Sequence, residues 1–514
     1  MSKTVDFEGK PFHFIGIGGI GMSALAYILA KRNLPVSGSD LRSTHITDRL
    51  ESVGAHIFQG QDAANLEFFQ TAKELARAGV GASSPMNGHG SNGNGTNGRT
   101  AIANNGKATR SPSQEKPQII CSTAIGAENE EYRAALKHGY PILHRSDLLA
   151  ALIQDYQGIA VSGTHGKTTT SSAIGHMLLE AGLDPTIIVG GEINSIGGNA
   201  RLGQGGYLVA EADESDGSLT KFSPAIGIVT NIELDHPDHY RNLDEVVATF
   251  KTFVRQCQTT VIGCIDCETV REKIAPKISY SLDPKKNADY TVTEVQYRAD
   301  GTLAKVWERG ILLGELKLQL LGEHNLGNAL AAVATGRYIG LKFEAIARGL
   351  ASFTGAKRRF EHRGEANGIT FVDDYAHHPS ELRATLAAAR LRLQAQNCES
   401  NGRPAGRLIA IFQPHRFSRT LTFLQEFAES FDDADTVVLT DIYSAGEANL
   451  EQISGEHLAR SLCDRHERVF YQPSLPEVRN FLQDTLQPGD LALFLGAGNL
   501  NQVIPQILTF YAEK

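Results

Sequence analysis

Short apolar runs alternate with stretches of helical periodicity along most of the chain, which is the pattern of α/β proteins with parallel sheets. Three strand–loop–helix units repeat this pattern at wide spacing and predict three α/β domains of roughly 150 residues each. Their strands and helices are expected at Phe12–Ile17 with Met22–Arg32, Gly158–Ser162 with Thr168–Glu180, and Ile369–Val372 with Ser380–Leu393. We place the three domains at residues 1–152, 153–355 and 356–514.

One segment interrupts the first domain. Residues 83–116 are rich in Gly, Asn, Ser and Thr and poor in large apolar side chains. Such a composition cannot bury enough apolar surface to offset the entropy lost when the chain is ordered. We therefore predict a disordered insertion at these residues.

Composition and charge narrow the class of protein. Hydrophobic residues make up 41% of the 514 residues, and the formal net charge is −9. An acidic balance argues against a nucleic-acid-binding protein and against attachment to an anionic membrane surface. No apolar run reaches the ~18 residues of a membrane span, no signal-peptide pattern precedes the first strand, and the scattered cysteines suggest no disulfide framework. These features predict a soluble protein of a reducing compartment, the cytoplasm.

A glycine-rich turn follows the first strand. Gly16, Gly18 and Gly21 lie between a strand and a helix, where small residues let backbone N–H groups approach a diphosphate. Asp40 ends the next strand, where an acidic side chain often binds a ribose hydroxyl. The pattern alone indicates a nicotinamide oxidoreductase or another protein with a diphosphate ligand. A glycine-rich turn without any ligand also stays open.

A second glycine loop, GTHGKT at Gly163–Thr168, also joins a strand to a helix. Backbone amides of such a loop cradle phosphate oxygens, a lysine here neutralises the β/γ charge, and a threonine hydroxyl can bind Mg²⁺. The loop is a short form, because Val161 stands where the longer P-loop has its first glycine. It predicts a nucleoside triphosphate site that uses Lys167 and Thr168.

Carboxylates follow two further strands. Residues 211–216 carry four of them directly after the apolar run Tyr207–Ala210, and Asn231–His236 follows the run Ile226–Thr230. The carboxyl ends of neighbouring parallel strands meet at one edge of a sheet, where α/β sites form. We expect a site for a hard cation there. The alternative is a solvated acidic face.

The third domain contributes two polar loops, residues 373–379 (DDYAHHP) and 413–419 (QPHRFSR). Arg416 and Arg419 lie about one helical turn apart and could bind a single carboxylate together. The chemistry of these loops alone does not name a substrate.

Taken together, these motifs resemble the Mur ligases. The motifs that carry the resemblance are, in chain order, GIGGIGM, GTHGKTTT, EADESDGS, NIELDHPDHY, GEHNLGNALAA, TGAKRRF, DDYAHHP, FQPHRFSRT and DIYSAGE. They run from about residue 11 to residue 500, in the order that the family shows across its three domains. The insertion at residues 83–116 departs from the family pattern.

The resemblance implies a fold and an activity. A Rossmann-like N-terminal domain would bind UDP-N-acetylmuramate, a central P-loop ATPase-type domain would bind Mg-ATP, and a Rossmann-like C-terminal domain would bring the amino acid. The implied reaction is ATP-dependent ligation of L-alanine to the carboxylate of UDP-N-acetylmuramate through an acyl phosphate, in peptidoglycan precursor synthesis. The implied cofactors are ATP and Mg²⁺. The implied partners are these small molecules, without nucleic acid or membrane insertion, and the chain would be a monomer or homodimer.

The resemblance also implies roles for single residues. The UDP-substrate would contact Gly18, Gly19, Gly21, Ser23 and Asp40. ATP would contact Gly163, Thr164, His165, Gly166, Lys167, Thr168, Thr169, His324, Asn325, Asn328, Arg359 and Asp374. Magnesium would be held by Thr168, Glu211 and His236, and the catalytic group would be Lys167, Glu211 and His236. L-Alanine would contact Arg416, Arg419, His378 and Tyr375.

Three rival functions stay open. A nicotinamide dehydrogenase accounts for the first glycine turn but leaves GTHGKT and the carboxylate loops without a role. A P-loop switch without ligase activity accounts for GTHGKT but not for the arginine and histidine loops. A ligase that recycles murein tripeptide shares a similar core, and the glycine and methionine usage in GIGGIGM favours the alanine-adding enzyme.

Overall fold

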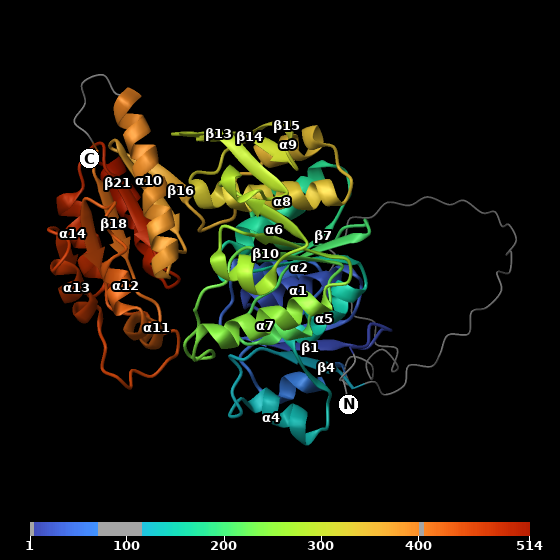
Figure 1. Ribbon diagram of the computed structural model, residues 1–514. Helices are drawn as coiled ribbons and strands as arrows, with labels where there is room; N and C mark the ends of the chain where they lie inside the picture. Colours follow the sequence, from blue (N-terminus) through green and yellow to red (C-terminus); the bar gives the residue numbers. More distant parts are fainter. Residues whose placement is uncertain (1–4, 70–115, 400–405) are drawn as a thin grey trace, which may run out of the picture. The chain divides into compact units, whose positions relative to one another are not determined.

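A computed structural model describes residues 5–69, 116–399 and 406–514 (Figure 1). The chain divides into two compact units, Met1–Leu148 and Leu149–Lys514. The expected insertion at residues 83–116 lies outside the described residues apart from Lys116. The domain boundary expected at residue 152 falls inside α5 (Arg145–Gln154), and we keep both expected boundaries as a proposal.

The first unit contains one parallel sheet in the order β3-β2-β1-β4-β5. The strands are β1 (Phe12–Ile15), β2 (Val36–Asp40), β3 (His56–Gln59), β4 (Gln118–Cys121) and β5 (Ile142–His144). The helices are α1 (Ile20–Lys31), α2 (His45–Ser52) and α4 (Glu130–Lys137). β1 is central and fully buried, and it ends earlier than expected because Gly16 turns the chain with a φ of 78°. The glycine turn is thereby fixed at the carboxyl end of the sheet.

The second unit contains two sheets, of which the first has ten strands in the order β15-β14-β13-β12-β11-β10-β6-β9-β7-β8. Its parallel strands are β6 (Gln157–Ser162), β7 (Thr186–Ile193), β9 (Tyr207–Glu211), β10 (Ile226–Val229), β11 (Thr260–Cys264), β12 (Ile278–Ser281) and β13 (Tyr290–Arg298). β6 lies between β9 and β10, so the loops after these three strands emerge side by side. The expected meeting of the phosphate loop and the two carboxylate loops is confirmed.

Antiparallel strands at the ends of this sheet differ from the parallel pattern expected from sequence. β14 (Gly301–Glu308) pairs antiparallel with β13 and with β15 (Ile311–Leu318), and β8 (Gly198–Arg201) pairs antiparallel with β7. Along β13, buried residues alternate with half-buried ones up to Thr293, and exposed residues alternate with half-buried ones from Glu294 onward. A sheet that faces water on one side favours this alternation and antiparallel pairing, whereas a parallel sheet is covered on both faces.

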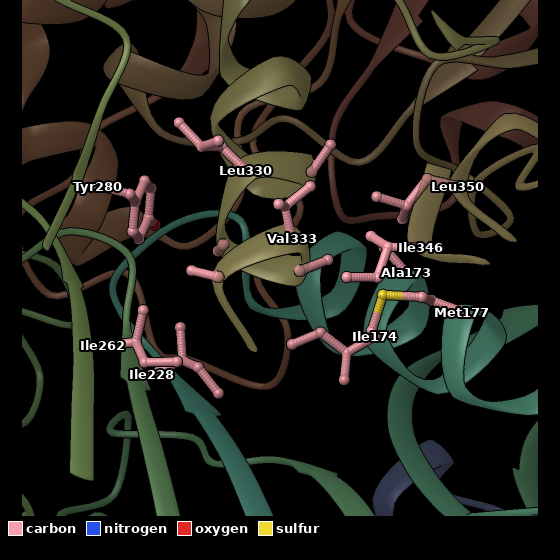
Figure 2. Close-up of a cluster of buried hydrophobic side chains, with 14 of the residues drawn as sticks. Ala173, Ile174, Met177, Ile228, Ile262, Tyr280, Leu330, Val333, Ile346 and Leu350 are labelled. Carbon is pink, nitrogen blue, oxygen red and sulfur yellow. The ribbon is translucent and has the colours of Figure 1, made fainter. Parts of the chain in front are cut away.

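Three helices build the core over the ten-stranded sheet. They are α6 (Lys167–Glu180), α8 (Glu323–Tyr338) and α9 (Phe343–Ala351). The buried side chains of α7 (Leu243–Gln256) are not part of this core. Figure 2 shows Met177 of α6, Val333 of α8 and Ile346 of α9 meeting around one another, with Ile228 and Ile262 of the sheet nearby. Because these side chains are buried, they hold the second half of α6 against the sheet, and the phosphate loop lies at the other end of the same helix.

The second sheet of this unit has the order β16-β17-β21-β18-β19-β20. The strands are β16 (Glu361–Ala366), β17 (Ile369–Asp374), β18 (Leu408–Phe412), β19 (Thr436–Leu439), β20 (Val469–Tyr471) and β21 (Leu491–Leu495). Its helices include α10 (Pro379–Glu399), α11 (Phe417–Thr422), α12 (Leu424–Ala428), α13 (Gly455–Cys463), α14 (Leu475–Thr485) and α15 (Ile504–Ala512). α10 extends to Glu399 and ends six residues after Leu393, where the expected helix ends. Within the described ranges, no helix combines the length and apolar character that crossing a membrane requires.

Candidate active site

The glycine turn of the first unit is organised by Asp40. The Gly18 amide donates to Asp40 Oδ2 at 2.8 Å, and Gly19 is the N-cap of α1. Ser23 is buried in the first turn of α1 and its hydroxyl donates to the Ile20 carbonyl at 3.0 Å. Asp40 therefore shapes the turn itself, whereas the sequence placed it only near the nucleoside.

Arg145 lies beside the same helix start and was missed by sequence reasoning. A Cβ added at Gly21 would lie 3.4 Å from Arg145 Nη1. The guanidinium adds positive charge at a helix N-terminus, which already favours an anion. No motif marks Arg145, because it lies more than a hundred residues from the glycine turn.

Two glycines of the phosphate loop cannot be replaced without strain. Gly163 has a φ of 141°, and a Cβ there would collide with the Thr230 hydroxyl. Gly166, the N-cap of α6, has a φ of 81°, and its Cβ would lie 2.5 Å from Asn328 Oδ1. Both positions therefore require glycine. The loop is also anchored to the strand end after β10, since the Thr164 amide donates to Asn231 O at 3.0 Å.

Lys167 begins α6 and is almost buried. Its Nζ donates to the carbonyls of Gly163 at 2.7 Å and Thr164 at 3.1 Å, and to Glu214 Oε2 at 2.9 Å. Burial alone would lower the pKa of Lys167, but the nearby carboxylates outweigh burial and hold that pKa above its ordinary value. Lys167 therefore carries a positive charge that the loop carbonyls and Glu214 keep in position.

Thr168 and Glu211 form an oxygen-rich pair at the start of α6. The Thr168 hydroxyl donates to Glu211 Oε2 at 2.9 Å, and the Gly190 amide donates to the same oxygen at 2.7 Å. Hydroxyl and carboxylate oxygens are the ligands that Mg²⁺ prefers, so the pair fits this ion. His236 lies on the neighbouring loop after β10, where its Nε2 is 3.6 Å from Asp235 Oδ2.

His236 has an unusual backbone and a neutral ring. Its φ is 55°, a conformation that residues other than glycine adopt rarely. Burial lowers the pKa of His236 despite the Asp235 carboxylate beside it. A neutral imidazole has a lone pair available for a metal ion or a phosphate-bound proton.

Asparagines of α8 contact the phosphate loop from the opposite side. The Thr170 hydroxyl donates to Asn328 Oδ1 at 3.1 Å, and Asn328 Nδ2 donates to Asn325 Oδ1 at 3.3 Å. Thr169 is buried on the same turn of α6. Burial lowers the pKa of His324 to about 4, with the charge of Arg359 acting in the same direction. The structure thus brings together the expected nucleotide residues of α6 and α8.

A pocket of about 310 Å³ lies where the two sheets of the second unit meet. Asn325 and Arg359 line it together with the segment from Thr354 to His362. Asp374 orders this segment, because its carboxylate accepts from the Phe360 amide at 2.6 Å and the Ala376 amide at 2.8 Å. Burial raises the pKa of Asp374 to about 6, against the charge of Arg359. Asp374 thus holds the backbone of the segment that lines the pocket.

The two arginines of the FQPHRFSRT loop are held by separate aspartates. Arg419 Nη2 lies 2.9 Å from Asp235 Oδ1, and both side chains are buried. Arg416 Nη1 lies 2.7 Å from Asp238 Oδ2, and this pair is about one-third exposed. Arg416 is the N-cap of α11, with a φ of 69°, and therefore lies before the first helical turn. Its side chain does not share a helical face with Arg419, which lies inside the helix. The sequence expected one shared face.

Tyr375 and His378 follow β17 and are tightly surrounded. The guanidiniums of Arg358 and Arg359 lie 4.9 Å and 5.1 Å from the centre of the Tyr375 ring. The His378 ring is buried, and its centre lies 4.7 Å from the ring centre of His165. The loop after β17 therefore reaches the phosphate loop directly.

Glu381, in the first turn of α10, is a central residue that sequence reasoning missed. It accepts from the His377 amide at 3.0 Å, and its other oxygen lies 3.2 Å from His165 Nδ1. A glutamate in a first helical turn is commonly a helix-stabilising residue. The available signal in the sequence was the position of Glu381 three residues after His378. Only the tertiary contact with His165 shows that Glu381 belongs to the site.

Comparison with known proteins agrees with this geometry. Three family models match in order: the Mur ligase family catalytic domain at residues 11–157, the Mur ligase middle domain at 161–336, and the Mur ligase glutamate ligase domain at 358–498. Together they cover all three sheets.

Relatives match this chain from end to end. A UDP-N-acetylmuramate--L-alanine ligase of Nostoc punctiforme is 63% identical over 514 residues, covering 100% of this chain and 99% of the relative. One from Synechococcus elongatus is 57% identical over 512 residues, covering 100% and 99%. The crystal structure of UDP-N-acetylmuramate-alanine ligase from Thermotoga maritima superposes with a TM-score of 0.75 at 26% identity, covering 98% and 99%. On these matches, and on the phosphate loop and carboxylate loops that lie side by side after β6, β9 and β10, the chain belongs to the Mur ligase family.

Proposed function

We propose that the chain is an ATP-dependent ligase that joins L-alanine to the carboxylate of UDP-N-acetylmuramate, a step of peptidoglycan precursor synthesis in the cytoplasm. The observation that carries the proposal is the end-to-end identity of 57–63% with relatives that bear this name. The phosphate loop supports the ATP requirement, because Lys167 and Thr168 begin α6 in the arrangement that binds a triphosphate.

The chemistry that we propose proceeds in two steps. The substrate carboxylate attacks the γ-phosphorus of ATP, the bond to the β-phosphate oxygen breaks, and an acyl phosphate and ADP result. The amine of L-alanine then attacks the acyl carbon, loses a proton, and inorganic phosphate leaves. Negative charge gathers on the transferring phosphoryl group, and Lys167 is placed to stabilise it.

Mg²⁺ would be held by Thr168 and Glu211, with His236 as a further ligand. The ion would supply neutralisation of phosphate charge. Thr168 and Glu211 are already 2.9 Å apart, so the protein needs little rearrangement to offer both oxygens. Gly190 leaves room for the carboxylate, since a Cβ there would lie 2.6 Å from Glu211 Oε2, and its amide donates to the same oxygen.

The remaining assignments follow from position. We place the diphosphate of the UDP-substrate at Gly18, Gly19, Gly21 and Ser23, and the nucleotide base of ATP in the pocket beside Asn325 and Arg359. We place the alanine carboxylate at Arg416, with Arg419 held behind it by Asp235, and the amine near Tyr375 and His378.

Phosphate release in the presence of UDP-N-acetylmuramate, ATP and each of the twenty amino acids in turn tests this function. We expect release with L-alanine and little release with larger amino acids. Preference for a tripeptide over L-alanine would support the recycling ligase instead. Release without any amino acid would support an ATPase, and an absorbance change of a nicotinamide cofactor would support a dehydrogenase.

Replacing Glu211 should raise the magnesium requirement. The Glu211→Ala variant loses the carboxylate that accepts from Thr168. Since the loss of one charge-assisted contact weakens binding about tenfold or more, we expect the Mg²⁺ concentration for half-maximal activity to rise at least about tenfold. Magnesium titrations of phosphate release measure the change. Glu344→Ala, an exposed change on α9, is the control. An unchanged titration would mean that another set of residues holds the ion.

Replacing Arg416 should weaken alanine binding selectively. Loss of one charge-assisted contact costs about 1.5–3 kcal/mol, so we expect the KM for L-alanine to rise roughly 10- to 100-fold in Arg416→Ala. The KM for ATP should stay near the wild-type value. Separate measurement of the two constants decides the assignment, and an increase confined to ATP would place Arg416 at the nucleotide.

A further inference from the structure

Three metal-binding side chains converge where the phosphate loop meets the start of α10. They are His165 of the phosphate loop, Glu233 of the loop after β10, and His378 before α10, and one ligand atom of each lies within 4.8 Å of the others. His165 Nε2 is 3.5 Å from Glu233 Oε2. The three residues come from segments far apart in the sequence, so the cluster exists only in the folded protein.

Two nitrogen atoms of this cluster are buried without a hydrogen-bond partner. Among the residues that the structure describes, His165 Nε2 and His378 Nε2 are both in this condition. The His378 residue is only 4% exposed. Because buried polar atoms nearly always have a partner, two such nitrogens near a carboxylate indicate that something else contacts them.

The surrounding residues orient the three side chains as ligands. Glu381 Oε1 lies 3.2 Å from His165 Nδ1 and Glu233 Oε2 lies 3.5 Å from His165 Nε2, so the ring stands between two carboxylates with Nε2 facing the cluster. Burial alone would lower the pKa of His165, but the two carboxylates raise it to about 10, so binding of an ion at Nε2 releases a proton. The Ser380 hydroxyl donates to Glu233 Oε2 at 2.7 Å. A carboxylate behind a histidine and a hydroxyl behind a carboxylate are the outer contacts that metal ligands usually have. The 3.3 Å contact from the Ser380 amide to His378 Nδ1 would open when His378 binds through Nε2.

The donor set selects a class of ion. Two imidazoles and one carboxylate suit Zn²⁺ and similar first-row ions, with one coordination position left for water or a phosphate oxygen. Mg²⁺ prefers a set of mostly oxygen ligands, and the separate Thr168–Glu211 pair offers two of them. We propose that His165, Glu233 and His378 form a site for a Zn²⁺-class ion, distinct from the magnesium site, that ties the phosphate loop to α10. The inference does not depend on the proposed ligase activity.

Direct metal binding tests this site on the full chain without ATP. Co²⁺ is titrated in the presence of excess Mg²⁺ and followed by its visible absorption, and Zn²⁺ binding is followed by calorimetry. We expect one ion per chain. Disturbing a metal site usually weakens binding at least about tenfold, and we expect this loss in His378→Gln and in Glu233→Gln. His176→Ala removes a buried histidine of α6 that contacts Ser195 and Ser352 instead, and should bind as wild type.

Glu211→Gln separates the two sites. Retained Co²⁺ binding in Glu211→Gln, together with loss in His378→Gln and Glu233→Gln, supports the proposal. Loss in Glu211→Gln with retention in His378→Gln would place the ion at the magnesium site and overturn it. Absence of stoichiometric binding by wild type would also overturn it. Circular dichroism of each variant confirms that a loss of binding does not reflect unfolding.

Discussion

Turnover should fall at least about 100-fold in Lys167→Ala, since removing one preorganised donor from a developing negative charge costs about 10²- to 10³-fold in rate. Lys167 Nζ is held by two loop carbonyls and Glu214. Its ammonium group therefore lies at the phosphate loop, where we expect negative charge to develop on the transferring phosphoryl group. Phosphate release at saturating ATP, alanine and UDP-substrate measures the loss. Lys273→Ala, an exposed lysine change in the same unit, should leave the rate unchanged.

A second variant separates chemistry from folding. In Lys167→Ala the Glu214 carboxylate, whose side chain is 2% exposed, loses its cation and is left buried. The double variant Lys167→Ala with Glu214→Gln removes both charges and should restore stability without restoring turnover. More than about a tenth of the wild-type rate in the folded double variant would contradict the role of Lys167 as a stabiliser of transition-state charge.

The second large effect is on stability. Arg419→Ala should lower the free energy of unfolding by about 3–5 kcal/mol, because breaking a buried ion pair leaves one charge uncompensated. Burial alone would raise the pKa of Asp235, but the Arg419 guanidinium outweighs burial and holds that pKa well below its ordinary value. Asp235 is therefore ionised in the wild type, and Arg419→Ala removes the guanidinium that compensates its buried charge. Urea or thermal unfolding measures the difference.

Arg416→Ala is the matched control, because Arg416 makes the same kind of contact three residues away. Its pair with Asp238 is one-third exposed, so its loss should cost about 1 kcal/mol or less. Replacing both buried partners, as in Arg419→Met with Asp235→Leu, should recover much of the stability. Equal destabilisation by Arg419→Ala and Arg416→Ala would show that burial does not distinguish the two pairs.

Local patterns predicted most of the parallel strands and the position of the phosphate loop. β6 and β17 include the residues that their apolar runs indicated, and α6 begins at the lysine of GTHGKT. These features are local, because a buried strand needs only a continuous apolar run and a phosphate loop needs adjacent glycines. The antiparallel strands β13–β15 were not predicted. Their apolar and polar residues alternate only weakly, and this alternation indicates a strand only once one face of the sheet is known to be exposed.

The tertiary structure decided which charged groups meet. From sequence, Arg416 and Arg419 were expected to face one ligand, and the structure instead pairs each with its own aspartate of the neighbouring sheet. Glu381 and Arg145 carried no motif, yet one contacts the phosphate loop and the other lies beside the α1 glycine.

The sequence by itself determined the class of fold, the phosphate loop and the family, because these depend on periodicity and on neighbouring residues. Only the tertiary structure decided which carboxylate holds which cation and which nitrogen atoms are buried together, as at His165 and His378. The physical reason is that an ion pair or a metal site depends on distance and burial. Neither quantity exists until strands from distant parts of the chain pair in one sheet and the helices cover them.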